Sequence, residues 1–262
     1  MQTKLGIGFV NFPTALSDER QMILARAAGF CSTALTLGEE RFDERFAAAE
    51  RAGVRVDAVY MPRDGVNFIW QSDEKWERLH ALYTACLSAA KASGVSTVIA
   101  TVSSGDAPAS TQEGLAHLRT FAAEAKEMGV HLAFENTESA EHFELAVRNC
   151  CLGFHGVCFR PSMAAVYWGS SAVPAYAKKH LFSVAIDDVL DGNDGYIPYD
   201  GEIDYAPFIR SLADASYRGV YFARVSPSCV RYRVLRYESF ASGAYEGLCR
   251  LARLSKDEEG IL

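Results

Sequence analysis

Four apolar runs in this sequence each end on a charged residue, and the charges alternate in sign. LAFE ends on Glu135, VCFR on Arg160, VAID on Asp187 and YFAR on Arg224. Burying such charges is costly unless they pair, so we expect a paired set at the mouth of a pocket. A carboxylate in such a set can move a proton. A guanidinium can stabilise developing negative charge or bind a carboxylate or phosphate.

The elements that must position these residues follow a repeating pattern. A helical stretch ends at a glycine and an apolar, β-branched run follows, as in residues 25–37, 50–61, 91–102, 126–136 and 216–225. With the runs at 4–10, 156–160 and 181–187, the pattern predicts eight buried strands separated by amphipathic helices.

We therefore expect an α/β fold, a single (β/α)8 TIM barrel over residues 1–262, with a charged, frayed tail at 256–262. A doubly wound open sheet would usually carry a glycine-rich phosphate loop after its first strand, and VNFPTALSDE is not such a loop. In a barrel, the chemistry collects at the carboxyl ends of the strands.

Composition limits the classes of partner. The net charge of −7 argues against general nucleic-acid binding. A C-terminal arginine cluster is interpreted as a solvated helix face rather than a binding patch; it consists of Arg231, Arg233, Arg236, Arg250 and Arg253. The seven cysteines include no C-x-x-C pair, which fits a reducing compartment. With neither a signal peptide nor a membrane-spanning stretch evident, we expect a cytoplasmic protein.

Several motifs resemble those of the xylose-isomerase-like TIM barrels. They are MPRDGVNFIW (61–70), LAFENTES (132–139), PYDGEIDY (198–205) and YRGVYFARV (217–225). That family includes sugar and sugar-phosphate isomerases and epimerases, with endonuclease-IV-type enzymes as distant relatives. The resemblance implies a small carbohydrate ligand. Barrels of this family often pair, which leaves a homodimer open.

Members of that family bind Mn, Mg, Co or Zn through His, Glu and Asp at the strand ends, and this sequence departs from the pattern. By this resemblance, Glu135 is the one metal ligand of the family that the sequence clearly retains. The positions of the other ligands hold Tyr60, Thr101, Arg160 with Met163, Ala185, the Asp194-Gly195-Tyr196 loop and Arg224.

Ligand chemistry therefore predicts that the metal site has been lost and that no metal cofactor is required. Glu135 with one further carboxylate from Asp187 or Asp188 is too small a donor set. A divalent ion about 5 Å from a guanidinium would cost roughly 6 kcal/mol at an effective dielectric constant near 20. We expect Arg160 and Arg224 to replace the ion's positive charge, held by Glu135 and, as a further candidate, Asp187.

The candidate catalytic residues are thus Glu135, Arg160 and Arg224. The candidate substrate-binding residues are Tyr60, Trp70, Thr101, Asp187, Asp188, Asp194 and Tyr196. Most have a structural alternative. The arginines can form an internal salt-bridge network with Glu135 as a partner, loop aspartates can cap turns, and the aromatic residues can be pocket wall.

Three functions remain open at this stage. The first is a metal-independent isomerase or epimerase acting on a sugar, sugar acid or sugar phosphate. The second is a non-catalytic sugar-binding protein that keeps the pocket. The third is a metal-dependent sugar isomerase whose ligands lie elsewhere. An endonuclease function is disfavoured, because this sequence lacks both the zinc ligands and the basic surface that such an enzyme needs.

Overall fold

The chain folds into a closed eight-stranded parallel barrel. The computed structural model describes residues 4–8, 16–37, 41–71 and 74–259 of the 262 residues. The strands follow one another around the barrel in the order β1-β2-β3-β4-β5-β6-β7-β10, and β10 closes it against β1. Their bounds are β1 Lys4–Gly8, β2 Ser32–Thr36, β3 Arg55–Tyr60, β4 Thr97–Thr101, β5 His131–Glu135, β6 Gly156–Phe159, β7 Leu181–Ile186 and β10 Val220–Ala223. The predicted single (β/α)8 barrel is confirmed.

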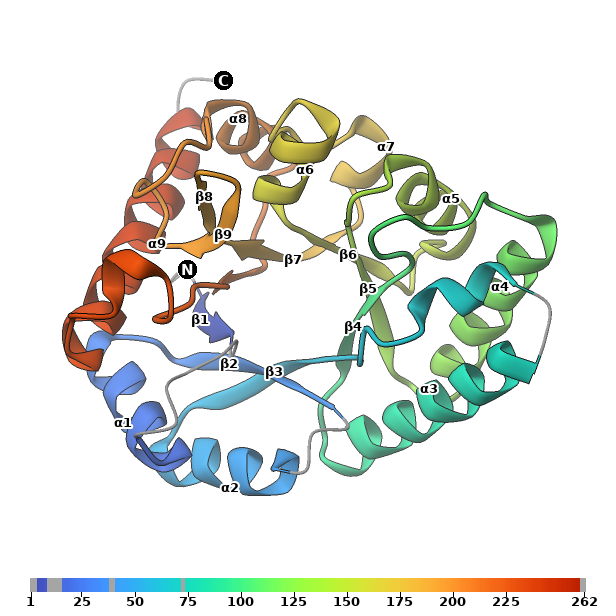
Figure 1. The fold of residues 1–262 in the computed structure, drawn as a ribbon, viewed down its shortest axis with the longest axis horizontal. Coiled ribbons are helices and arrows are strands. Elements are labelled where there is room, and N and C mark those ends of the chain that lie inside the picture. Colours follow the sequence, from blue (N-terminus) through green and yellow to red (C-terminus); the bar gives the residue numbers. More distant parts are fainter. Residues whose placement is uncertain (1–3, 9–15, 38–40, 72–73, 260–262) are drawn as a thin grey trace.

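Helices surround the strands as an outer ring (Figure 1). They are α1 Asp18–Ala28, α2 Phe42–Ala52, α3 Glu74–Ala92, α4 Gln112–Glu127, α5 Ala140–Cys150, α6 Pro161–Trp168, α7 Ala175–Lys178, α8 Ala206–Asp214 and α9 Tyr237–Glu259, with short 3-10 turns η1 Val66–Trp70 and η2 Val230–Tyr232. Gly29 ends α1 with φ 116°, and its N–H bonds to carbonyls of the last turn, as the sequence pattern predicted.

At the C-terminus, α9 continues into the tail that was predicted to be frayed, as far as Glu259, and residues 260–262 lie outside the described part of the chain. No helix among the described residues is long and apolar enough to cross a membrane.

Strand alternation divides the apolar core into two layers. Residues facing outward pack against the helices, and a smaller cluster fills the barrel. The inward-facing members are Ala34, Ala58, Ile99, Ala133, Cys158, Ala185 and Phe222. Most are small, so one large ring can occupy the interior. A Cβ atom on Gly6 would lie 2.6 Å from the Phe222 ring, so β1 requires glycine there.

An antiparallel hairpin follows β7 and was not predicted as strands. It comprises β8 Asp188–Leu190 and β9 Asn193–Tyr196, joined through a turn with Gly192 at φ 73°. The sequence DGNDG (191–195) forms this turn and the start of β9. The PYDGEIDY loop then leads to α8, where the Asp204 carboxylate accepts a hydrogen bond from the Ala206 N–H.

We predict that Gly201→Ala destabilises the protein by about 1–3 kcal/mol, the usual effect of overpacking. A Cβ atom there would lie 2.5 Å from Asp188 Oδ1 and would also contact the Val189 carbonyl oxygen, in the loop held by Asp188. The free energy of unfolding from a urea titration measures the effect. Replacement of the exposed neighbour Glu202 by Ala is the control, and an equal loss in both variants would contradict this account.

Candidate functional site

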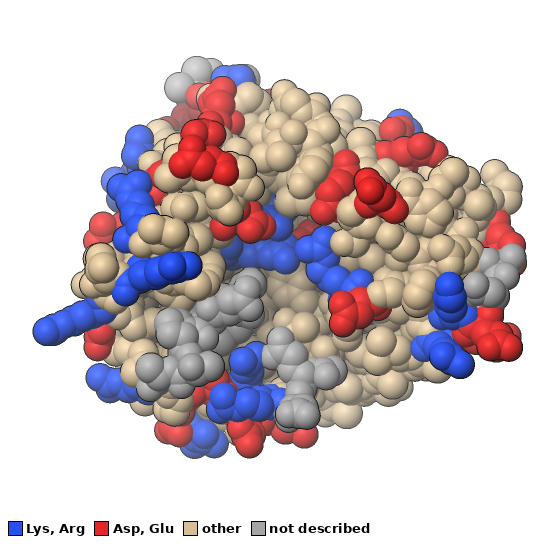
Figure 2. All heavy atoms as spheres, viewed as in Figure 1, with Lys and Arg blue, Asp and Glu red and all other residues tan. Residues whose placement is uncertain are grey.

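The charged residues predicted at the strand ends do come together. Glu135 is the last residue of β5, and Arg160, Asp187 and Arg224 directly follow β6, β7 and β10. These four strands are neighbours in the barrel. Figure 2 shows Lys and Arg side chains crossing the hollowed centre of this face, with carboxylates beside them.

Strand alternation explains why these side chains point toward the barrel axis. Each lies two residues beyond a residue of the interior cluster, and successive inward-facing positions on a strand are two apart. The pairs are Ala58 and Tyr60, Ile99 and Thr101, Ala133 and Glu135, Cys158 and Arg160, Ala185 and Asp187, and Phe222 and Arg224.

Arg160 is buried in an ion pair with Asp187. Its Nε donates to Asp187 Oδ1 at 2.9 Å, and its Nη2 donates both to Asp187 Oδ2 and, at 2.5 Å, to Asp194 Oδ2. Only 3% of the Arg160 side chain and none of the Asp187 side chain is exposed. Burial lowers the pKa of Arg160, but Asp187 outweighs this effect and the pKa lies well above its ordinary value. The guanidinium is therefore permanently charged.

Further donors complete this buried pair. Asp187 also accepts hydrogen bonds from Ser162 Oγ at 2.5 Å and from the Gly195 N–H at 3.2 Å. The Asn136 amide brackets the Arg160 backbone, because its Oδ1 accepts from the Arg160 N–H and its Nδ2 donates to the Arg160 carbonyl. Asn136 belongs to the LAFENTES motif (132–139), which therefore has a structural role in placing Arg160.

Arg224 forms a second, separate pair with Glu135. Its Nη1 donates to Glu135 Oε2 at 2.8 Å, and its guanidinium carbon lies 5.4 Å from the centre of the Tyr60 ring. Among the described residues, the buried Glu135 Oε1 has no hydrogen-bond partner, and the same holds for the buried Tyr60 hydroxyl. Burial, with Glu135 nearby, raises the pKa of Tyr60 well above its ordinary value, so the phenol stays neutral.

This arrangement corrects the predicted pairing of both arginines with Glu135, and it confirms the further candidate, Asp187, as the partner of Arg160. Glu135 binds Arg224, whereas Arg160 binds Asp187 and Asp194. The physical reason is position around the barrel, because β7 lies directly beside β6 and its following residue reaches the Arg160 guanidinium.

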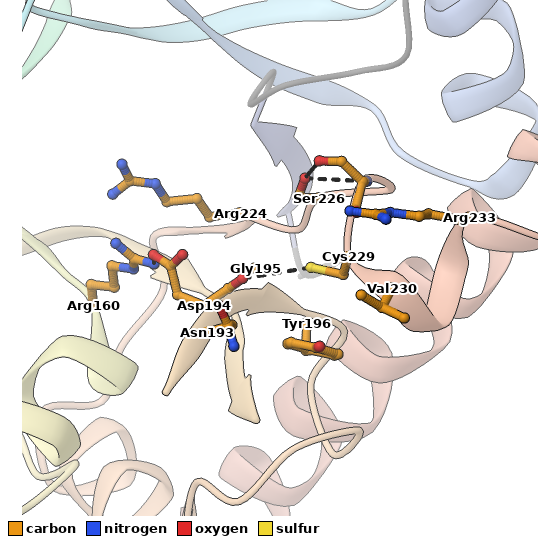
Figure 3. Close-up of a pocket in the computed structure, with 11 residues that line it drawn as sticks. Arg160, Asn193, Asp194, Gly195, Tyr196, Arg224, Ser226, Cys229, Val230 and Arg233 are labelled. Carbon is orange, nitrogen blue, oxygen red and sulfur yellow. Dashed lines mark hydrogen bonds and ion pairs between the residues drawn. The ribbon is translucent and has the colours of Figure 1, made fainter. Parts of the chain in front are cut away.

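A cavity of about 440 Å³ lies beside the two arginines (Figure 3). The strand-end arginines, the β8–β9 hairpin and the segment after β10 line it. The lining residues are Arg160, Asn193, Asp194, Gly195, Tyr196, Arg224, Ser226, Ser228, Cys229, Val230 and Arg233. Of these, the sequence predicted Arg160, Arg224, Asp194 and Tyr196. Arg233 belongs to the C-terminal arginine cluster. It is exposed to solvent, as predicted for that cluster, and it also lines the cavity, which was not predicted.

Six predicted residues do not line this cavity. Glu135, Tyr60 and Asp187 contact its two arginines, whereas the other three, Trp70, Thr101 and Asp188, have different surroundings. Trp70 is 2% exposed, donates from Nε1 to the Val102 carbonyl at 2.7 Å and packs edge-on against His142, so it belongs to the core. Thr101 is buried at the end of β4 and does not line the cavity.

Asp188 was predicted to bind a sugar hydroxyl, and the structure contradicts this. Its side chain is fully buried and its carboxylate accepts hydrogen bonds from the backbone N–H groups of Val189, Tyr199 and Ile203. Three backbone donors occupy the two oxygens, so Asp188 holds the hairpin and the following loop in place.

The donor set at the strand ends does not suit a divalent cation. Glu135 Oε2 and both oxygens of Asp187 already accept hydrogen bonds from guanidinium groups. Within the described residues, no group of three or more His, Cys, Asp or Glu side chains could hold a metal ion. Hard cations need several free anionic or carbonyl oxygens, and two arginines beside the site would repel one.

Comparisons with known proteins agree with the fold. A family model described as xylose isomerase-like TIM barrel matches residues 5–228. A xylose isomerase domain protein from Alicyclobacillus acidocaldarius subsp. acidocaldarius superposes with a TM-score of 0.70 at 19% identity, covering 97% of this chain and 100% of that one. An L-ribulose 3-epimerase gives 0.74 at 15% identity, with 99% and 98% covered.

A third structure of this fold is a D-psicose 3-epimerase with D-tagatose from Clostridium cellulolyticum H10. It superposes with a TM-score of 0.72 at 14% identity, covering 97% of this chain and 99% of that one. At such identities the likeness shows the fold alone. A comparison with curated proteins found no match.

We predict that Asp187→Asn destabilises the protein by about 3–5 kcal/mol, because it leaves Arg160 buried without its main counter-charge. The matched control is Asp194→Asn, which removes the other carboxylate on the same guanidinium. The Asp194 side chain is 62% exposed, so its loss should cost less than about 1 kcal/mol. Urea unfolding at pH 7 measures both, and equal losses would show that Asp187 is not the dominant partner.

Proposed function

The chain belongs to the xylose isomerase-like TIM barrel family, and we propose that it is a carbohydrate isomerase or epimerase that works without a metal ion. The observation that carries this proposal is the Glu135 carboxylate: one oxygen is bound to Arg224, while the other is buried and has no partner among the described residues. Two of the structures of similar fold are an L-ribulose 3-epimerase and a D-psicose 3-epimerase, which supports a carbohydrate as the ligand.

The chemistry proposed for this site is proton transfer next to a carbonyl. Glu135 Oε1 accepts the proton from carbon, and the bonding electron pair moves to the carbonyl oxygen to give an enediolate. In an isomerisation the proton returns from Glu135 to the adjacent carbon, while the hydroxyl proton passes between the two enediolate oxygens. In an epimerisation a water molecule protonates the opposite face of the same carbon, and Glu135 returns its proton to the hydroxide that forms. No oxidant or reductant is consumed.

Arg224 is the residue best placed to stabilise the enediolate oxygen. Within the described residues it donates a single hydrogen bond, to Glu135, and 13% of its side chain is exposed where it lines the cavity. A fixed cation in a water-poor site stabilises developing negative charge more strongly than solvent does. Tyr60 lies against the same guanidinium, and its neutral hydroxyl can donate to a substrate oxygen.

Arg160 has a different role in this proposal. Its Nε and Nη2 groups are engaged by Asp187 and Asp194, and its side chain is almost fully buried. We therefore assign Arg160 to positioning Asp194 and to adding positive potential, rather than to direct contact with the reacting oxygen.

A sugar-binding protein without catalysis is the second candidate, and one observation favours it. Glu135 does not line the cavity but lies behind Arg224, with 2% of its side chain exposed. Catalysis therefore requires the substrate carbon to reach Glu135 past the Arg224 guanidinium. Proton exchange separates the two candidates, because a binding protein would bind sugars without exchanging their C–H protons.

We predict that Glu135→Gln lowers the rate of substrate C–H exchange by more than about 10²-fold, since the amide cannot accept the proton. NMR in D₂O follows the exchange across a panel of ketoses and their phosphates. The exposed glutamate of α4, replaced as Glu113→Gln, is the matched control and should retain full activity.

The same assay tests the absence of a metal requirement. Wild-type exchange should be unchanged by EDTA, and elemental analysis should find less than about half an equivalent of Mn, Zn or Co. A stoichiometric metal whose removal abolishes exchange would refute the metal-free mechanism. If sugars bind but none of them exchanges its C–H proton, the non-catalytic binding protein is favoured.

We predict that Tyr60→Phe leaves stability unchanged within about 0.5 kcal/mol, because the lost hydroxyl has no hydrogen-bond partner among the described residues. Exchange activity should nevertheless fall by about 10-fold or more, since the hydroxyl is proposed to bind a substrate oxygen. Thermal unfolding measures the effect on stability, and the D₂O exchange assay measures the effect on activity. Full activity in the variant would exclude Tyr60 from the reaction.

A further inference from the structure

The cavity has two ends of different chemistry. Figure 3 shows the Arg160 and Arg224 guanidinium groups with the Asp194 carboxylate at one end, and Ser226, Cys229 and Arg233 at the other. We call these the inner and outer ends, the outer end consisting of Ser226, Ser228, Cys229 and Arg233. The proposed chemistry occupies the inner end, so the polar groups at the outer end lie beyond the reacting atoms.

Arg233 contributes a positive charge that no carboxylate of the cavity neutralises. Its Nε donates to the Ser228 carbonyl at 3.0 Å, and within the part of the chain that the structure describes it forms no ion pair. The carboxylate that lines the cavity, Asp194, is already paired with Arg160. By contrast, Arg231, two residues earlier, pairs with Asp200 and does not line the cavity.

Two serine hydroxyls lie beside this guanidinium. Ser226 Oγ and Ser228 Oγ are 2.5 Å apart, so one hydroxyl donates to the other and the second keeps its hydrogen available. The Arg233 Nη groups and this hydroxyl hydrogen form a set of donors. Such a set binds the oxygens of a phosphate or carboxylate, because guanidinium presents its N–H groups as a planar fork.

The segment that carries these groups is anchored to the rest of the site. The Ser226 N–H donates to the Gly195 carbonyl at 2.7 Å, which ties the segment to the β8–β9 hairpin. The Tyr232 hydroxyl donates to Asp200 Oδ2 and accepts from the Ile197 N–H. The donors are therefore held in position before any ligand binds, which lowers the entropy cost of binding.

We propose that the outer end is an anion subsite, and that the carbohydrate bound here carries a phosphate or carboxylate held by Arg233, Ser226 and Ser228. The identity of the ligand as a carbohydrate rests on the proposed function, whereas the anion subsite rests on these contacts. A volume of about 440 Å³ suits a ligand of this kind, within the range of small-molecule sites. The anion at the outer end then directs the sugar carbonyl toward Arg224.

Binding of four probes to the full-length protein, measured by calorimetry, tests the subsite. The probes are D-fructose, D-fructose 6-phosphate, 5-keto-D-gluconate and inorganic phosphate. We expect the phosphate ester or the keto acid to bind at least 10-fold more tightly than D-fructose, and the tighter of the two identifies the anion. Equal affinity for fructose and both anions, or binding of none of the four probes, would overturn the proposal.

Variants then assign the preference to particular residues. Arg233→Gln should abolish the preference for the anion, and Arg231→Gln, the matched control on the same segment, should change it less than about two-fold. Arg233→Gln also removes the bond to the Ser228 carbonyl, so Ser228→Ala, which keeps that bond, is a second variant with an expected loss of at least three-fold. An anion preference that survives in Arg233→Gln would contradict the assignment.

This experiment fails differently from the test of the proposed function. Proton exchange on neutral ketoses with no anion preference would uphold the isomerase and refute the subsite. An anion preference that Arg233→Gln abolishes, without exchange on any compound, would uphold the subsite and refute the isomerase.

Discussion

The buried ion pair between Arg160 and Asp187 is the interaction on which the rest of this site depends. Two charges removed from water are tolerated only when their geometry is good and their remaining donors and acceptors are satisfied. Here Ser162 and the Gly195 N–H donate to Asp187, and Asp194 accepts a further hydrogen bond from Arg160. The pair joins the ends of β6 and β7 to the β8–β9 hairpin, and this hairpin forms one wall of the cavity. The shape of the cavity therefore follows from the pair.

The two consecutive aspartates after β7, Asp187 and Asp188, have different structural roles. Asp187 faces the barrel axis and holds a guanidinium, whereas Asp188 turns away and accepts three backbone N–H groups. Neighbouring residues of an extended chain point to opposite sides, so one short segment can serve both purposes. The same geometry explains why the following loop has Gly201, since a side chain there would collide with the Asp188 carboxylate.

Guanidinium groups differ from a metal ion in ways that shape the proposed chemistry. An arginine is charged at every accessible pH and, unlike a metal ion, cannot be released from the protein. It directs its charge through N–H donors rather than through open coordination positions. Arg160 uses its donors to build the site, whereas Arg224 donates within the described residues to Glu135 alone. Polar atoms of Glu135 and Tyr60 beside Arg224 have no partner among the described residues, which lowers stability and is expected where a site is organised for a ligand.

The sequence by itself determined the barrel, because strand alternation, helix-ending glycines and the βα repeat are local patterns. It also identified Glu135, Arg160, Asp187 and Arg224, since a charge after a buried strand marks a barrel mouth whatever the rest of the chain does. Only the tertiary structure decided which carboxylate pairs with which arginine. It also decided that Trp70 packs in the core and that Asp188 accepts hydrogen bonds from backbone N–H groups. It alone brought Arg233 to the cavity. The reason is that Glu135 and Arg224 are 89 residues apart, and the loop paths that set such contacts depend on hydrogen bonds between segments, which no local pattern encodes.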